Sequence, residues 1–124
     1  MMLKEIVILR DEGGFAQTAR WQQVNQEIQD AIAAVVWPPG SHDFTIYPER
    51  KGNGVLPIKD EFVASLTARG WKHERRALLD GSGPGPIDAL KDFPDGDTFI
   101  CEWETGNVSS SHRALNKMVV INFT

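Results

Sequence analysis

The sequence predicts an α/β fold, because helical and strand patterns occur in separate parts of one 124-residue chain. Apolar residues recur at helical spacing over residues 17–36, whereas residues 98–104 alternate as a strand does. A chain of this length suits one core, so we expect a single domain over residues 1–124. The composition, 41% hydrophobic and 24% charged, is that of a globular protein.

The first half of the chain is predicted to be mainly helical. Residues 3–9 fit either a short strand or a helical turn, and their spacing favours neither. A helix is predicted over residues 17–36, ending before Pro38 because the residue preceding a proline is disfavoured in helical conformation. A second helix is predicted from Pro57, which suits the first helical position, with Gly70 as its C-terminal stop.

The second half is predicted to be mainly strand. Residues 71–79 mix aromatic, charged and apolar side chains and suit a strand, as do residues 87–91. Residues 93–98 carry the proline, glycine and aspartates typical of a hairpin turn. The brief extended piece predicted at Phe44, Ile46 and Tyr47 belongs to the first half.

Two carboxylates stand on one face of the predicted strand 98–104. Glu102 and Glu104 lie two residues apart, so their Cβ atoms are about 7 Å apart and their charges oppose joint ionisation. A divalent cation between them would relieve this repulsion, because carboxylate oxygen suits hard metals. The alternative is an edge strand with a solvated acidic face, which the pair taken alone favours.

The length of the hairpin loop decides whether Asp88 joins this acidic pair. A three-residue loop around Asp95 and Gly96 places Asp88 opposite either Glu102 or Glu104. A two- or four-residue loop would place Asp88 on the other face, because a one-residue slip reverses a strand. A triad of acids on one face would be a metal site.

Charge and cysteine usage narrow the function classes. A net charge of −4 argues against a nonspecific nucleic-acid coat, although a nuclease can neutralise its acids with bound metal. No apolar run approaches the roughly 20 residues needed to span a bilayer, so no membrane partner is expected. Cys101 is the single cysteine, which favours an intracellular location, and we interpret it as a small core residue rather than a nucleophile.

Longer strings in this sequence resemble a known family. The segments WPPGSHDFTI, GNGVLPIKDEF, GPID and EWETGNVSSSHRALNK are similar to those of BamHI-like type II restriction endonucleases, from about Trp37 to Lys117. The resemblance implies a restriction-endonuclease-like core, with a central mixed β-sheet flanked by helices. It also implies a cytoplasmic prokaryotic homodimer that uses Mg²⁺ to cut both strands of a short palindrome similar to GGATCC.

The resemblance also assigns roles to individual residues. Asp88 and Glu102 match the metal-coordinating acids, and Glu104 matches the acid that replaces a lysine more usual in the superfamily. Glu74 matches a further catalytic acid. Three residues match positions that contact DNA, and a helix from about Ser110 resembles one that forms the dimer interface. The DNA-contacting residues are Asn107, Ser109 and Arg113.

The resemblance is incomplete after Lys117, where residues 118–124 are β-branched and unlike the family's leucine-rich helix. Family members continue well beyond this point, so we expect a core that is incomplete at its C-terminus. Two other functions therefore remain open. The first alternative to the nuclease is a noncatalytic remnant that binds DNA or dimerises. The second is an acidic interaction domain that uses its four tryptophans.

Overall fold

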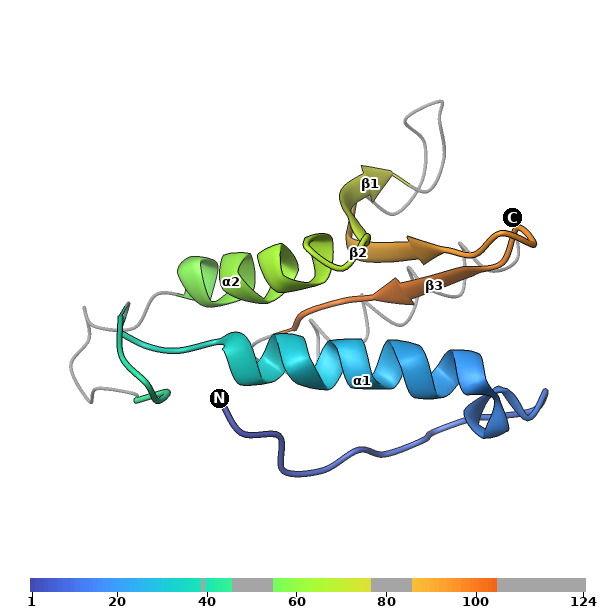
Figure 1. The fold of residues 1–124 in the computed structure, drawn as a ribbon, viewed down its shortest axis with the longest axis horizontal. Coiled ribbons are helices and arrows are strands. Elements are labelled where there is room, and N and C mark those ends of the chain that lie inside the picture. The colour runs from blue at the N-terminus through green and yellow to red at the C-terminus, as the bar shows by residue number, and fades with distance from the viewer. Residues whose placement is uncertain (39, 46–54, 77–85, 105–124) are drawn as a thin grey trace. The chain divides into compact units, whose positions relative to one another are not determined.

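The computed structural model describes residues 1–38, 40–45, 55–76 and 86–104, although the side chains of residues 55–57 and 74–76 lie outside the description. The chain divides into two compact units, Met1–Arg69 and Gly70–Thr124 (Figure 1). Within the described residues, no helix is both long and apolar enough to cross a bilayer.

The first unit begins with a short 3₁₀ helix, η1 (Phe15–Gln17), and helix α1 (Ala19–Ala34). Thr18 stands between them in an extended conformation, and its Oγ1 accepts a hydrogen bond from the Trp21 N–H at 3.1 Å. This contact satisfies one of the unpaired amides of the first helical turn. The predicted helix is therefore confirmed, but it is two residues shorter at each end than predicted.

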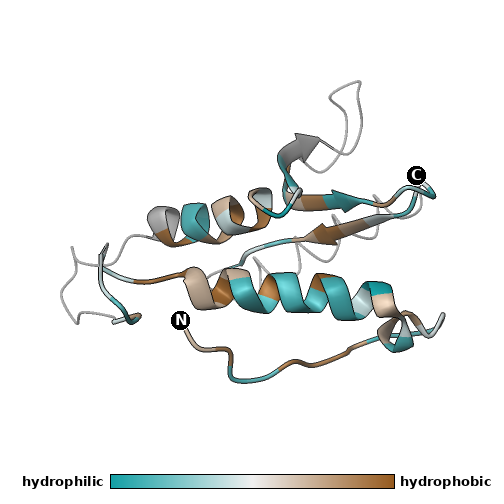
Figure 2. Cartoon of the chain, viewed as in Figure 1, coloured by the Kyte–Doolittle hydropathy of each residue, from teal (hydrophilic) through white to brown (hydrophobic). Residues whose placement is uncertain are grey.

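Helix α2 (Val55–Thr67) packs against α1 and supplies most of the core of this unit. It begins two residues before Pro57, so the prediction that Pro57 starts the helix is wrong. Glu61 Oε2 accepts a hydrogen bond from the Val36 N–H at 3.0 Å, which joins α2 to the end of α1. Figure 2 shows apolar and hydrophilic residues alternating along α1. The buried apolar residues are Val24, Ala31, Val35, Ile58, Phe62, Val63 and Leu66.

Two segments among the described residues of the first unit belong to no helix and no sheet. Residues 1–11 contain neither helix nor strand, so neither alternative for residues 3–9 is found. The Met1 ammonium donates to the Val35 carbonyl at 2.5 Å, at the C-terminal end of α1. Phe44 forms an isolated bridge with Trp37, as expected for a brief extended piece, whereas Ile46 and Tyr47 lie outside the described residues.

The second unit contains a three-stranded sheet in the order β1-β2-β3 (Figure 1). Its strands are β1 (Lys72–Arg76), β2 (Pro86–Asp92) and β3 (Thr98–Cys101). Both pairings of the described strands are antiparallel, so a mixed sheet stays a prediction. The helix and strand content is compatible with the α/β class. Trp71 lies just before β1 and is buried, with its ring 6.0 Å from that of Phe99 in an edge-on arrangement.

The turn between β2 and β3 has the predicted three-residue loop. The Phe93 N–H donates to the Asp97 carbonyl at 2.8 Å, and the Gly96 N–H donates to the Phe93 carbonyl at 3.0 Å. Gly96 has a φ of +94°, a conformation that side chains with a Cβ disfavour. This loop sets the register that pairs Ala89 with Cys101 and Asp92 with Thr98.

Candidate metal-binding active site

Asp88 is the buried charged residue of the described part of the chain, with 8% of its surface exposed. It lies on the central strand β2, between the buried residues Ile87 and Ala89. Its side chain is therefore largely removed from water. Burying a carboxylate is unfavourable unless hydrogen bonds or opposite charge compensate for lost hydration. Asp88 therefore needs polar or cationic neighbours.

One such neighbour is the backbone of Trp103, whose N–H donates to Asp88 Oδ2 at 2.9 Å. Trp103 lies two residues after Cys101, the last residue of β3. A hydrogen bond to an ionised acceptor is among the stronger hydrogen bonds in proteins. It connects the buried carboxylate directly to the segment that carries Glu102 and Glu104.

The register of the sheet aligns three acidic positions. The pairs His73↔Ala89 and Arg75↔Ile87 place Glu74 opposite Asp88 on the neighbouring strand. On the other side the pairing ends at Ala89 with Cys101. Glu102 is the next residue, and the Trp103 N–H that follows it donates to Asp88. We call the three backbone positions Glu74, Asp88 and Glu102 the acidic row.

The predicted acids differ in their exposure to solvent. Glu102 is half-buried and its Oε1 atom is removed from solvent, whereas Glu104 is exposed. β3 ends at Cys101, so the prediction of one strand over residues 98–104 is wrong for its last three residues. The described pairing stops before Glu102, so the pairing of Asp88 with either Glu102 or Glu104 stays a prediction. The predicted triad is not found, because Asp88, Glu102 and Glu104, all of them described, do not form a group that could hold a metal.

The pKa of Cys101 reflects the negative charges beside the acidic row. Its pKa is raised to about 12, first because the thiol is buried and then because the charges of Asp88 and Glu102 oppose a thiolate. Both carboxylates therefore act on the same small region. A thiol with this pKa is protonated at neutral pH, which agrees with the interpretation of Cys101 as a core residue rather than a nucleophile.

The donor chemistry of Asp88 and Glu102 fits a magnesium ion. Mg²⁺ prefers oxygen ligands and is commonly held by one or two carboxylates, with water and substrate phosphate completing the shell. Asp88 offers a buried carboxylate and Glu102 a half-buried one, both of the kind that Mg²⁺ binds. Among the described side chains, no three acids, histidines or cysteines are grouped closely enough to hold a metal.

Comparison with known proteins adds an independent observation. The family model described as "Restriction endonuclease BamHI" matches residues 1–123. The chain belongs to this family of restriction endonucleases. It is 46% identical over 121 residues to the type II restriction enzyme OkrAI of Oceanobacter kriegii, an alignment that covers 97% of this chain and 60% of OkrAI.

A second relative is the type II restriction enzyme BamHI of Bacillus amyloliquefaciens. It is 36% identical over 107 residues, covering 80% of this chain and 50% of BamHI. This member of the BamHI family therefore spans between half and three-fifths of the length of these two relatives. The resemblance that the sequence motifs indicated is confirmed.

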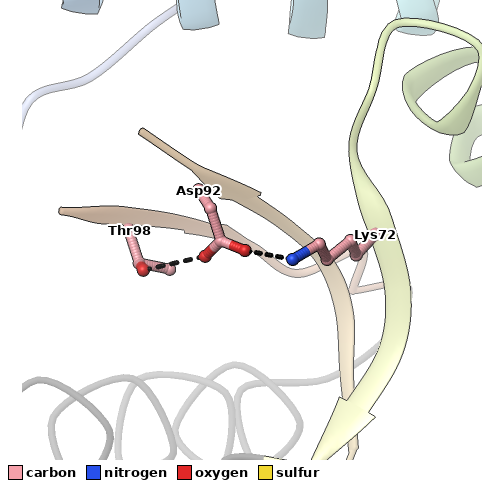
Figure 3. A network of polar contacts seen from close by, with 3 residues as sticks. All are labelled: Lys72, Asp92 and Thr98. Atoms are coloured by element: carbon pink, nitrogen blue, oxygen red, sulfur yellow. Dashed lines mark hydrogen bonds and ion pairs between the residues drawn. The ribbon is translucent and has the colours of Figure 1, made fainter. Parts of the chain in front are cut away.

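A polar network that the sequence did not predict lies at the end of the sheet near the turn between β2 and β3 (Figure 3). The Lys72 ammonium on β1 donates to Asp92 Oδ2 on β2, and Thr98 Oγ1 on β3 donates to Asp92 Oδ1 at 3.1 Å. The Asp92 carboxylate therefore connects all three strands. Asp95 does serve the turn, since its Oδ1 accepts the Asp97 N–H at 3.1 Å.

The predicted DNA-contacting residues lie outside the described part of the chain. These are Asn107, Ser109 and Arg113, and the helix predicted from about Ser110 lies there as well. Sequence reasoning also missed the backbone N–H of Trp103 as a partner of Asp88. No local signal could have revealed it, because the pair depends on the register between two strands.

Proposed function

We propose that this chain carries the metal site of a Mg²⁺-dependent endonuclease that cuts double-stranded DNA at a short palindrome similar to GGATCC. The observation that supports it best is the hydrogen bond that ties the segment of Glu102 to Asp88, because the resemblance implies that these two acids coordinate the metal. The burial of Asp88 adds to this support, since an idle buried carboxylate destabilises a fold.

The proposed roles of the acids follow from their positions. Asp88 and Glu102 would hold Mg²⁺ through carboxylate oxygens. When bound, the metal would lower the pKa of water and neutralise charge on the scissile phosphate. Glu104, exposed and two residues beyond Glu102, would accept a proton from the attacking water. Glu74, opposite Asp88 in the register, would add negative charge to the same site.

The proposed DNA contacts come from residues after the acidic row. Arg113 carries a planar guanidinium, which can donate to guanine O6 and N7 and is worth about 1–3 kcal/mol of discrimination. Asn107 and Ser109 would bind the backbone or base edges near the start of the predicted helix. Because a palindrome presents the same half-site twice, we propose that two copies of the chain act together.

Cleavage of a supercoiled plasmid with one GGATCC site, in Mg²⁺, tests this function. Wild-type protein should yield the linear form, and Glu102→Gln should lower the rate by at least about 100-fold because it removes a charged ligand. Glu12→Gln is the matched control, since Glu12 is an exposed acid in the first unit and should leave the rate unchanged.

Two outcomes would contradict the proposal. Equal cleavage by wild-type protein and Glu102→Gln would mean that the acidic row is not the active site. Specific binding of the duplex in Ca²⁺ without cleavage in Mg²⁺ would instead support the noncatalytic DNA-binding alternative.

A further inference from the structure

The hydrogen bond from the Trp103 N–H to the Asp88 side chain takes the place of the backbone hydrogen bond that a regular sheet would form there. If β3 continued in register beyond Cys101, Trp103 would lie opposite Ile87. The Trp103 N–H instead donates to the side chain of Asp88, at 2.9 Å. The strand thus ends at the acidic row, where a carboxylate on β2 takes over from the backbone as the acceptor.

This hydrogen bond lies next to Glu102 in the chain. Cys101, the residue before Glu102, is held by its pairing with Ala89 on β2. Trp103, the residue after Glu102, is held by the side chain of Asp88. The backbone of Glu102 is therefore tied to β2 on both sides, so Asp88 influences where the second proposed metal ligand lies.

An ionised carboxylate can accept several hydrogen bonds or metal contacts at once, because its two oxygens offer about four lone-pair sites. Acceptance of the Trp103 N–H at Oδ2 is therefore compatible with binding a cation. An asparagine at this position would keep a neutral acceptor of nearly the same shape but lose the charge that a metal needs. An alanine would lose both.

We propose that Asp88 has two separable roles, as the acceptor that positions the Glu102 segment and as a metal ligand. The first role rests on the hydrogen bond to the Trp103 N–H, and the second rests on the proposed function. The positioning role needs only an acceptor oxygen, whereas the metal role needs a negative charge. The two roles should therefore respond differently to asparagine and to alanine.

The experiment follows the backbone amide of Trp103 by NMR in protein labelled with ¹⁵N-tryptophan. The chain has four tryptophans, and loss of one signal in Trp103→Phe assigns the resonance. Without metal, Asp88→Asn should keep the Trp103 amide protected from hydrogen exchange. Asp88→Ala should accelerate its exchange by at least about tenfold, because the acceptor is gone. The Trp21 amide, in the first unit, is the internal control for folding.

The metal role is read in the same samples by adding Mn²⁺, a paramagnetic substitute for Mg²⁺. The Trp103 amide of the wild-type protein should broaden, because it lies beside a proposed ligand. In both Asp88 variants this broadening should be lost, although the amide remains protected in Asp88→Asn.

The possible results separate the two roles. If the Trp103 amide exchanges as fast in Asp88→Asn as in Asp88→Ala, a neutral acceptor oxygen does not hold the segment, and the positioning role is overturned. If Mn²⁺ does not broaden the Trp103 amide signal of the wild-type protein, the metal role of Asp88 and the proposed function are both overturned. Slower hydrogen exchange in Asp88→Asn than in Asp88→Ala would still support the positioning role. If Asp88→Ala does not fold, hydrogen exchange of the Trp103 amide is compared only between the wild-type protein and Asp88→Asn. Fast exchange of the Trp103 amide in the wild type would then overturn the hydrogen bond itself.

Discussion

Asp88 is a charged residue at a buried position of β2, where apolar residues are usual. Ile87 and Ala89 beside it are almost fully buried, and the Trp103 N–H ties the segment that carries Glu102, a second acid, to Asp88. Two acids close together oppose joint ionisation. Local conflicts of this kind concentrate at functional sites, because selection for binding or catalysis tolerates a loss of stability there.

The raised pKa of Cys101 predicts a thiol that is unreactive while the protein is folded. At pH 8 a pKa of about 12 leaves about a thousandfold less thiolate than the ordinary value of 9.0. Alkylation by iodoacetamide, followed by mass spectrometry, should therefore be about a thousandfold slower in the native protein than in urea. Similar rates in the two states would show that the thiol is neither buried nor influenced by the acids.

The same shift predicts how stability depends on alkaline pH. The folded pKa of Cys101 lies above the unfolded value, so folding favours the protonated thiol. This contribution is fully present below about pH 9 and is lost as the pH rises toward 12. Urea denaturation at pH 8 and pH 10.5 should show a smaller alkaline loss in Cys101→Ala than in wild type. An equal loss would contradict the assignment.

Gly96 and Gly13 form a matched pair for testing the hairpin turn. An added Cβ would meet nothing within 4 Å at either position, but Gly96 has a φ of +94°. Gly96→Ala should therefore lower the free energy of unfolding by about 1–2 kcal/mol through backbone strain alone. Gly13→Ala should cause no loss, since it restricts only the unfolded chain. Urea denaturation of both variants measures the difference, and equal stabilities would contradict the turn geometry.

At the scale of the elements, polar contacts at both ends of the sheet fix the register of its strands. The turn and the Lys72–Asp92–Thr98 network act at one end, and the hydrogen bond between Asp88 and Trp103 acts at the other. A slip of one residue would move an entire strand to the opposite face and separate the acidic positions. The network is therefore a structural support for the acidic row.

Two ion pairs allow this support to be tested. Lys72 and Asp92 lie twenty residues apart with side chains about half exposed, whereas Arg10 and Glu12 are two residues apart and mostly exposed. Lys72→Gln should lower the free energy of unfolding by up to about 1 kcal/mol, because solvent screens the pair. Arg10→Gln should cause no measurable change. Urea denaturation compares them, and a loss in Arg10→Gln as large as that in Lys72→Gln would contradict this ranking.

At the scale of the whole molecule, the negative net charge and the proposed palindrome set requirements for DNA binding. A chain with a net charge of −4 is repelled by DNA overall, so divalent cations must offset the acids where the phosphate approaches. Cutting both strands of a palindrome requires two active sites related by twofold symmetry, and each chain carries one acidic row.

We therefore predict two chains for each palindromic duplex. Light scattering during size-exclusion chromatography in Ca²⁺ should give the mass of the duplex plus twice 13.8 kDa. A scrambled duplex of equal length is the control and should elute without bound protein at moderate salt. One chain for each duplex would predict nicking of single strands and would contradict the proposed double-strand cleavage.

Much of this architecture was predictable because it depends on local chemistry. The helix over residues 19–34, the presence of three strands among the described residues and the three-residue loop follow from apolar spacing, from alternation and from the turn residues Asp95 and Gly96. The end of β3 was misplaced, because alternation continues to residue 104 whereas the paired strand stops at Cys101. The N-terminal residues 3–9 resisted prediction because their β-branched side chains suit a strand but pair with no strand in the part of the chain that the structure describes. The start of α2 was misplaced because a favourable residue for the first helical turn does not by itself define the first residue.

The sequence by itself determined the α/β class, the acids available for a metal and membership of a nuclease family, because composition, periodicity and motifs are properties of neighbouring residues. Only the tertiary structure decided that Asp88 is buried on the central strand, that the backbone of Glu74 lies opposite it and that the Trp103 N–H binds it. The reason is physical: strand register and burial arise from contacts between residues far apart in the chain, and such contacts leave no local pattern.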